Sequence, residues 1–538
     1  MSQNKWIQIR KDLTQALEQQ VKSLLGENSP DLAAYNSEYQ KEFKKKWKIS
    51  SKKEILQSFS VSQLVLLGDF HALQQSQKSH LRLLREFVQK RKSLVLALEC
   101  FSVDDQHKLD KYMTGRWNEK DFLKSIQWQK QWGFPWENIR PLMRWLQKHK
   151  VPVYGLNIKD NSSSKKTLRE RDHFAALKIK DILEIHPDHL PIIIYGDLHL
   201  ARPHLPKQLL KVLGPSVMKK TLRVFQNSEK IYFELLKTEK ESTTDVVHLG
   251  KHDFCLLNVP PWVKWQNYLM YLEKTYDRGL KSKEDDIDYT DHVGRFVKLL
   301  AEDLGCQVKL TELSVYNTKD KNFWSQLQKK LSNKDLKVIE FFIETQRSFY
   351  LPSVQIAYLA RASVNHAAHL AMLFLRQQLT QEKHNYLNMP QDFLRQIWLE
   401  TISYLGSKMI NPKRKTDTLF DIKLAMTSGP GAQIESEALK LALSQKMREL
   451  ILLSGRQYSR AAYVPKKRKS YFIAAELLGG MLGEKIYNGF HRKMINMDLI
   501  RTLVLKSVAY DGFELAYYEI LEIIEALPEP FKSKQERL

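Results

Sequence analysis

Two short motifs in the sequence repeat the pattern glycine, aspartate, any residue, histidine. The first is GDFH at residues 68–71 and the second is GDLH at residues 196–199, and each directly follows a run of apolar residues. Side chains two residues apart in an extended chain point the same way, so each motif can present a carboxylate and an imidazole together. Such a pair can ligate a metal ion or transfer a proton.

A third acidic residue, Glu99, ends the apolar run LVLALE at residues 94–99. A carboxylate at that position costs free energy unless it is paired or used. Open α/β sheets bind ligands in the crevice beyond the carboxyl ends of their strands. Five titratable residues are expected at this edge: Asp69, His71, Glu99, Asp197 and His199.

Either motif alone has a simpler explanation, because an aspartate or histidine after a strand often caps the next helix or a turn. Two such motifs with Glu99 between them favour a binding or reactive site, since perturbed titratable groups cluster at such sites. We therefore predict one polar crevice at the carboxyl ends of the strands. Metal ligation and acid–base chemistry both remain open at this point.

The elements that must position these residues can be read from short apolar runs at 63–67, 93–98, 151–156 and 190–195. These runs are apolar at nearly every position, which is typical of strands covered by helices on both faces of a parallel sheet. Shorter runs at 222–225, 230–235, 245–248 and 254–258 are expected to extend the sheet. The predicted fold class is α/β, a mostly parallel sheet flanked by helices, followed by a largely all-α C-terminal domain.

Changes in composition suggest the domain boundaries. We expect a helical N-terminal extension at 1–50, the α/β domain at 51–265 and a linker at 266–290 that includes a highly charged stretch. Helical spacing of apolar residues then predicts a helical domain at 291–538. The sequence assigns no role to that helical domain.

The composition limits the classes of function. Lys and Arg number 85 against 61 Asp and Glu, giving a net charge of +24 that attracts polyanions without identifying one. Nucleic-acid binding by the basic run at 465–469 is therefore neither predicted nor excluded, and a solvated loop is the simpler explanation. Three scattered cysteines, no export signal at the N-terminus and polar residues within the apolar stretch 354–375 predict a cytoplasmic protein without a membrane span.

The stretch from about Leu64 to Pro261 resembles the ChaN-like haem-binding family, whose superfamily also includes erythromycin esterases and Tiki-type proteases. The similar motifs occur in order, and they are GDFH at 68–71, LALECF at 96–101, WQKQWGFPW at 128–136, VPVYGLNI at 151–158 and GDLH at 196–199. Asp69 stands where the family usually has glutamate. Arg171 and Asp172 resemble an Arg-Asp element of the superfamily, although Ala175 replaces a methionine usually found soon after it.

The resemblance implies two functions. In the first, the protein binds haem or a related small-molecule cofactor, with His71 and His199 as candidate ligands oriented by Asp69, Glu99 and Asp197. In the second, it is a hydrolase in which His71 or His199 activates water and Glu99 is the general acid or base. If a divalent metal takes part, its ligands would be His71, Glu99 and His199. The sequence does not decide whether the protein is an enzyme, and a homodimer is an open alternative.

Overall fold

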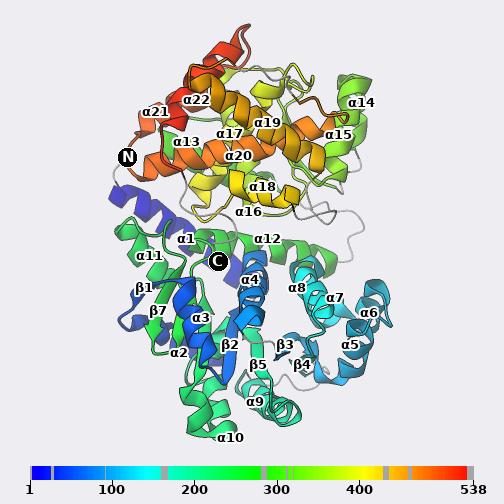
Figure 1. The fold of residues 1–538 in the computed structure, drawn as a ribbon, viewed down its shortest axis with the longest axis vertical. Coiled ribbons are helices and arrows are strands. Elements are labelled where there is room, and N and C mark those ends of the chain that lie inside the picture. The colour runs from blue at the N-terminus through cyan, green and yellow to red at the C-terminus, as the bar shows by residue number, and fades with distance from the viewer. Residues whose placement is uncertain are drawn as a thin grey trace. The chain divides into compact units, whose positions relative to one another are not determined.

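The computed structural model describes residues 3–25, 30–90, 93–158, 168–279, 288–310, 313–318, 320, 322–427, 435–457 and 463–529. The chain divides into two compact units (Figure 1). One comprises Ile7–Thr275, and the other comprises Tyr276–Arg537 together with Met1–Trp6. We call them the α/β unit and the helical unit.

The α/β unit is built on an eight-stranded sheet with the strand order β1-β7-β8-β6-β2-β5-β3-β4. Its strands are β1 (Lys48–Ser50), β2 (Leu64–Asp69), β3 (Leu94–Ser102), β4 (Val153–Asn157), β5 (Leu190–Gly196), β6 (Thr221–Gln226), β7 (Val246–Gly250) and β8 (Asp253–Leu256). All neighbouring strands from β8 through β4 pair in parallel, and β7 is antiparallel to both of its neighbours. The predicted mostly parallel sheet is confirmed.

The prediction of one strand was wrong. The run KIYFEL at 230–235 lies in helix α11 (Glu229–Lys237), not in the sheet. Its buried residues are Ile231, Tyr232, Leu235 and Leu236. The four-residue spacing between the two pairs places them on one face of a helix, so the apolar residues of this run pack with helical and not with strand periodicity.

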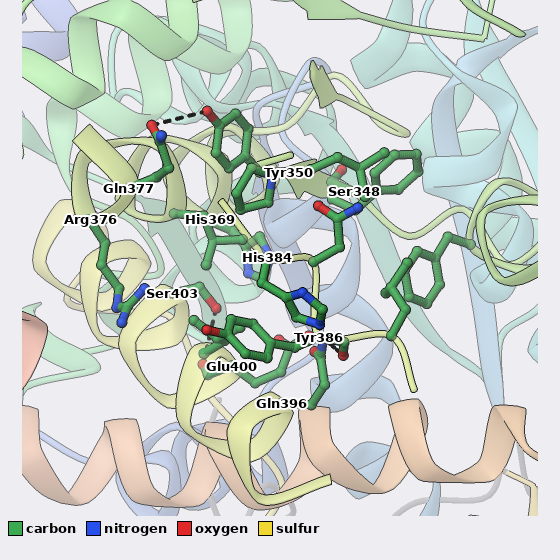
Figure 2. Close-up of a pocket in the computed structure, with 18 of the residues that line it drawn as sticks. Ser348, Tyr350, His369, Arg376, Gln377, His384, Tyr386, Gln396, Glu400 and Ser403 are labelled. Carbon is green, nitrogen blue, oxygen red and sulfur yellow. Dashed lines mark hydrogen bonds between the residues drawn. The ribbon is translucent and has the colours of Figure 1, made fainter. Parts of the chain in front are cut away.

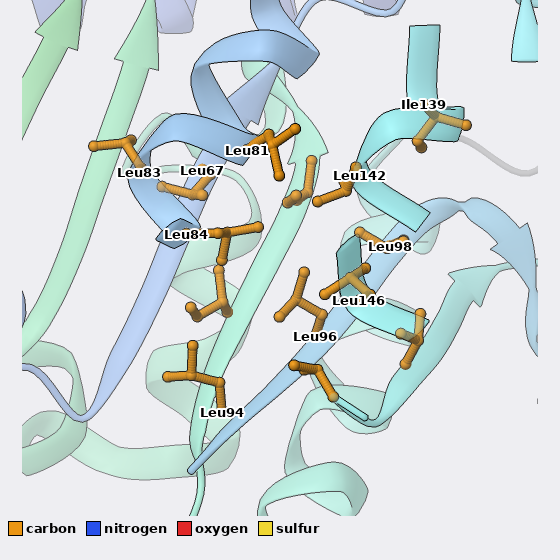
Figure 3. Packing of buried hydrophobic residues seen from close by; sticks show 14 of the residues in the cluster. Leu67, Leu81, Leu83, Leu84, Leu94, Leu96, Leu98, Ile139, Leu142 and Leu146 are labelled. Atoms are coloured by element: carbon orange, nitrogen blue, oxygen red, sulfur yellow. The ribbon is translucent and has the colours of Figure 1, made fainter. Parts of the chain in front are cut away.

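Helices cover both faces of the sheet. Val65 and Leu67 of β2 belong to one hydrophobic cluster, and Leu64 and Leu66 belong to another, because alternate residues of a strand point to opposite faces. The first cluster includes α3 (Lys52–Ser60), α4 (Gln74–Lys90), α5 (Gln106–Met113), α6 (Glu119–Ser125), α7 (Trp128–Gln131) and α8 (Trp136–Lys148). Figure 3 shows leucines of α4 and α8 packing over β2 and β3. The second includes α9 (Leu168–Ile185), α10 (Leu205–Lys219) and α11.

The N-terminal segment contributes to the α/β unit. It contains α1 (Gln3–Leu25), α2 (Pro30–Lys41) and the short helix η1 (Glu42–Lys44). Tyr39 of α2 and Phe43 of η1 join the second hydrophobic cluster, and β1 pairs with β7 at the edge of the sheet. The segment expected as an extension therefore supplies a strand and part of the core. At the other end of the unit, α12 (Pro261–Gly279) occupies the first part of the expected linker.

The C-terminal part is largely helical, as predicted. Its helices are α13 (Thr290–Leu304), α14 (Phe323–Lys330), α15 (Asn333–Glu344), α16 (Val364–Thr380), α17 (Phe393–Ile410), α18 (Leu419–Thr427), α19 (Ser436–Leu453), α20 (Lys469–His491), α21 (Met497–Leu505) and α22 (Phe513–Glu525). A small three-stranded sheet accompanies them, made of β9 (Val315–Tyr316), β10 (Phe349–Leu351) and β11 (Ile356–Tyr358). No helix in the described part of the chain has the length and apolar character needed to cross a membrane.

The packing predicts a large difference between two leucine substitutions in helices of the α/β unit. Leu84 of α4 is fully buried, whereas Leu177 of α9 is 40% exposed. Leu84→Ala should lower the free energy of unfolding by about 2–5 kcal/mol because it leaves a cavity, and Leu177→Ala by no more than about 0.5 kcal/mol. Urea unfolding followed by tryptophan fluorescence measures this, since eight of the eleven tryptophans lie between residues 47 and 265. Equal losses would contradict the packing described.

Candidate functional site

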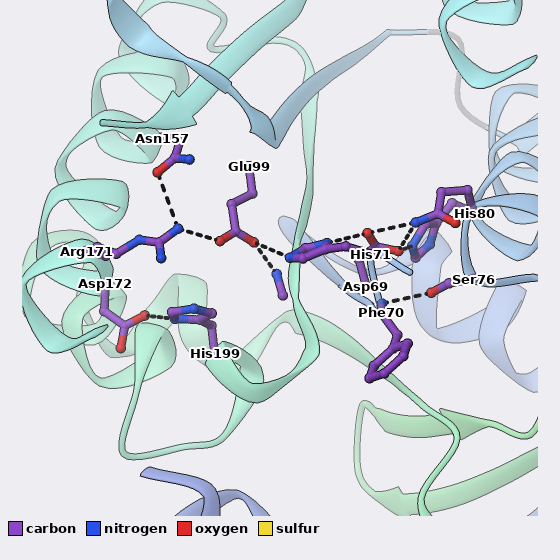
Figure 4. Close-up of polar contacts among 12 residues, drawn as sticks. Asp69, Phe70, His71, Ser76, His80, Glu99, Asn157, Arg171, Asp172 and His199 are labelled. Carbon is purple, nitrogen blue, oxygen red and sulfur yellow. Dashed lines mark hydrogen bonds and ion pairs between the residues drawn. The ribbon is translucent and has the colours of Figure 1, made fainter. Parts of the chain in front are cut away.

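Three adjacent strands deliver polar side chains to one edge of the sheet. β5 lies between β2 and β3. Asp69 ends β2, Glu99 lies in the last part of β3, and Gly196 ends β5 and is followed by the short helix η3 (Asp197–Leu200). Figure 4 shows a continuous chain of hydrogen bonds and ion pairs through Asn157, Arg171, Glu99, His71, Asp69 and His80.

The two motif glycines lie where chain segments and side chains approach closely. A Cβ atom on Gly68 would lie 1.7 Å from Asp197 Oδ1, so only glycine allows β2 and η3 to approach as they do. A Cβ on Gly196 would lie 3.2 Å from both Glu99 Oε2 and His199 Cδ2 and 3.5 Å from His71 Nε2. Gly196 therefore stands at the point around which these three side chains gather.

His71 is held between two carboxylates. Its Nδ1 lies 2.8 Å from Asp69 Oδ2, and its Nε2 lies 3.5 Å from Glu99 Oε2. The side chain is 21% exposed, against 4% for Glu99. Burial lowers the pKa of His71, but the hydrogen bond to Asp69 and the charge of Glu99 outweigh burial and raise it above its ordinary value.

Asp69 is stabilised in its charged form. Besides His71, it accepts hydrogen bonds from the Gln77 side-chain amide at 2.9 Å and lies 3.2 Å from Nε2 of His80. Burial alone would raise the pKa of Asp69, but the two histidines lower it far below its usual range. Asp69 is therefore a fixed negative partner for the Nδ1 of His71.

Glu99 is equally well satisfied. Its Oε1 accepts a hydrogen bond from Arg171 at 2.9 Å, and its Oε2 accepts one from the backbone N–H of Gly196 at 2.6 Å. Burial opposes ionisation, but the charges of His71, His199 and Arg171 lower the pKa of Glu99 below its ordinary value. Glu99 is thus an ionised carboxylate beside the Nε2 of His71.

His199 forms a second, more deeply buried pair. Its Nδ1 lies 2.7 Å from Asp172 Oδ1 and 2.7 Å from the Tyr35 hydroxyl, which donates to the other Asp172 oxygen at 2.8 Å. Tyr35 also stacks on His204 with ring centroids 3.4 Å apart. The sequence reasoning did not place Tyr35, Arg171 or Asp172 among the site residues. The only signal for Tyr35 was its four-residue spacing from Tyr39 in a segment treated as an extension.

Asp197 has a different environment from the other predicted residues. Its carboxylate accepts hydrogen bonds from the Tyr39 hydroxyl and from the backbone N–H of Gln226. Burial is the main cause that raises the pKa of Asp197 to about 7. Among the described residues, no hydrogen bond joins Asp197 to His71, Glu99 or His199. Asp197 thus links η3 to α2 and β6 through these two hydrogen bonds.

The cavity beside His71 is small. It is lined by Asp69, His71 and Glu99 on one side and by aromatic rings on the other, and its volume is about 20 Å³. A space of that size holds about one water molecule. Trp132 and Phe134 contact the His71 ring, with centroid distances of 4.5 and 5.2 Å. Two residues of the segment WQKQWGFPW at 128–136 are therefore packed against the histidine ring.

The residues fit neither a haem between the two histidines nor a metal centre. Glu99 fills the space between His71 and His199 (Figure 4). In the parts of the chain that the structure describes, no three His, Cys, Asp or Glu side chains are arranged to hold a metal ion.

Comparison with known proteins gives one match. Residues 55–170 match the family described as haem-binding uptake, Tiki superfamily, ChaN. This range includes Asp69, His71 and Glu99, whereas Arg171, Asp172 and His199 lie beyond it. Neither the curated proteins nor the solved structures contain a significant match. The match confirms the family resemblance, and residues 55–170 of the α/β unit are similar to that family.

Proposed function

We propose that the α/β unit is a hydrolase of carboxylic esters or amides in which His71 is the general base. The observation that carries this proposal is the environment of the His71 ring. Asp69 holds Nδ1, Glu99 lies near Nε2, and a cavity with room for about one water molecule adjoins the ring. A histidine oriented by a carboxylate on one nitrogen and open to water near the other is the arrangement that general-base catalysis requires.

The proton transfer uses the Nε2 atom of His71. When Nδ1–H donates to Asp69, Nε2 carries the free lone pair and can accept a proton. The distance of 3.5 Å to Glu99 Oε2 is too long for a good hydrogen bond, so Nε2 is not committed to that carboxylate. Asp69 and Glu99 together stabilise the positive charge that the ring acquires.

The proposed reaction balances without a cofactor. Nε2 takes a proton from water as the water oxygen bonds to the carbonyl carbon, and the carbonyl oxygen becomes negative. Arg171, which pairs with Glu99 at 2.9 Å, contributes positive charge to the network that adjoins His71. The bond to the leaving alcohol or amine then breaks, and the imidazolium returns its proton to the leaving group.

Removal of the proposed base should abolish hydrolysis without unfolding the protein. His71→Gln is expected to lower kcat/KM for short p-nitrophenyl esters or for peptides by about 10²–10⁴-fold, the usual contribution of a general base. The matched control is His186→Gln, since His186 contacts Tyr154 outside the site. Circular dichroism checks the fold of both variants. Full activity in folded His71→Gln would reject His71 as the base.

Haem binding is the second candidate, and the family match favours it. It requires His71 to turn away from Glu99 and the aromatic wall at Trp132 and Phe134 to open, because the present cavity is far too small for a porphyrin. An ester or amide substrate also needs the aromatic wall to open, since the cavity holds about one water molecule. Haem would then occupy the same site as the proposed substrate, with His71 as a ligand.

A titration with haemin separates the two candidates. If the site is hydrolytic, any change in the Soret band should be the same in the wild type, His71→Gln and His199→Gln. A saturable one-to-one shift that is lost in His71→Gln and kept in His199→Gln would establish haem binding and contradict the primary proposal. His199 is the matched control because Asp172 and Tyr35 hold its ring in a buried position.

A further inference from the structure

The helical unit contains a separate cavity that the proposed hydrolytic function does not use. Its volume is about 60 Å³, and it lies beside β10, α16 and the start of α17 (Figure 2). One part of its wall is apolar and includes Phe349, Leu373 and Leu399. The wall also contains polar side chains, among them Arg376, Glu382 and Tyr386.

Two deeply buried polar groups in the wall have no hydrogen-bond partner among the described residues. The Tyr386 side chain is 5% exposed, and its hydroxyl is unpaired. Arg376 is 4% exposed and donates to Glu382 and to the backbone carbonyl of Lys506, yet its Nε–H is also unpaired. Buried polar groups are almost always satisfied in folded proteins, and both of these groups can donate a hydrogen bond to an acceptor in the cavity.

His369 adds a third polar group to the same wall. Among the described residues, none forms a hydrogen bond with its ring. Burial, together with the positive charges of Arg414 and Arg347, lowers the pKa of His369 to about 3. The ring is therefore neutral and can donate a hydrogen bond from one nitrogen and accept one at the other.

The backbone conformation of Tyr386 supports a role for this residue in a binding site. The φ angle of Tyr386 is 50°, in the left-handed region. Left-handed backbone is uncommon for a bulky residue and costs free energy. Strain of this kind is typically retained where it places a side chain at a binding site.

We propose that this cavity binds a short-chain carboxylate of about two to four carbon atoms. A carboxylate only accepts hydrogen bonds, which matches the unpaired donors of Arg376 and Tyr386. The short hydrocarbon chain packs against Phe349 and Leu373. The volume admits only a few non-hydrogen atoms, since one water molecule needs about 10–15 Å³ on the same scale.

Calorimetric titration of the full chain with propionate tests the proposal, with propionamide and inorganic phosphate as comparisons. Propionate should bind one-to-one and at least about tenfold more tightly than propionamide, because hydrogen bonds to a charged acceptor are stronger than those to a neutral one. Phosphate, which lacks an apolar part, should not displace it. Equal binding of the amide, displacement by phosphate or no saturable binding of propionate would each overturn the proposal.

The substitution Tyr386→Phe tests directly whether the Tyr386 hydroxyl binds propionate. It should weaken propionate binding by about tenfold or more while leaving the melting temperature of the free protein unchanged or higher, since it removes an unpaired buried hydroxyl. The matched control is Tyr517→Phe, whose hydroxyl donates to Glu449 at 2.8 Å. That control should lower the melting temperature and keep the affinity. If Tyr386→Phe lowers the melting temperature and keeps the affinity, the hydroxyl is structural and the proposal fails.

Discussion

The polar site depends on the close approach of β2 and β5. These strands pair in parallel from Val65↔Ile192 to Asp69↔Gly196, and glycine at 68 and 196 lets the chain segments beyond them meet. A side chain at position 68 would occupy the place of the Asp197 carboxylate. The approach brings His71 and His199 to opposite sides of Gly196, with Glu99 from the next strand between them.

The same approach buries acidic groups that must be compensated. An isolated buried carboxylate is very costly, and removal of one partner from a buried pair is strongly destabilising. Asp69 is compensated by His71, His80 and Gln77, and Glu99 by Arg171 and a backbone N–H. Because Asp69 and Glu99 have fixed partners, the His71 ring has a fixed orientation, which the proposed proton transfer requires.

The sequence predicted those parts of this arrangement that follow from local pattern. The apolar runs predicted the parallel sheet. Four polar residues were expected to share one edge of that sheet because they follow strands: Asp69, His71, Glu99 and His199. The sequence did not predict that Tyr35 and Tyr39 form hydrogen bonds with His199 and Asp197, because these contacts join residues more than 150 positions apart. For the same reason Asp197 was grouped with the crevice, although its partners are Tyr39 and Gln226. The helix at 230–235 was missed because an apolar run of six residues suits either a strand or a buried helix.

The most direct test of the account is the pKa of His71, measured by NMR in protein with labelled histidine and assigned with His71→Gln. The coupling to Asp69 and Glu99 predicts a pKa above the ordinary value of 6.5, and Asp69→Asn should lower it because one negative partner is lost. A wild-type pKa at or below 6.5 that Asp69→Asn leaves unchanged would contradict the Asp69–His71–Glu99 coupling on which the proposed function rests.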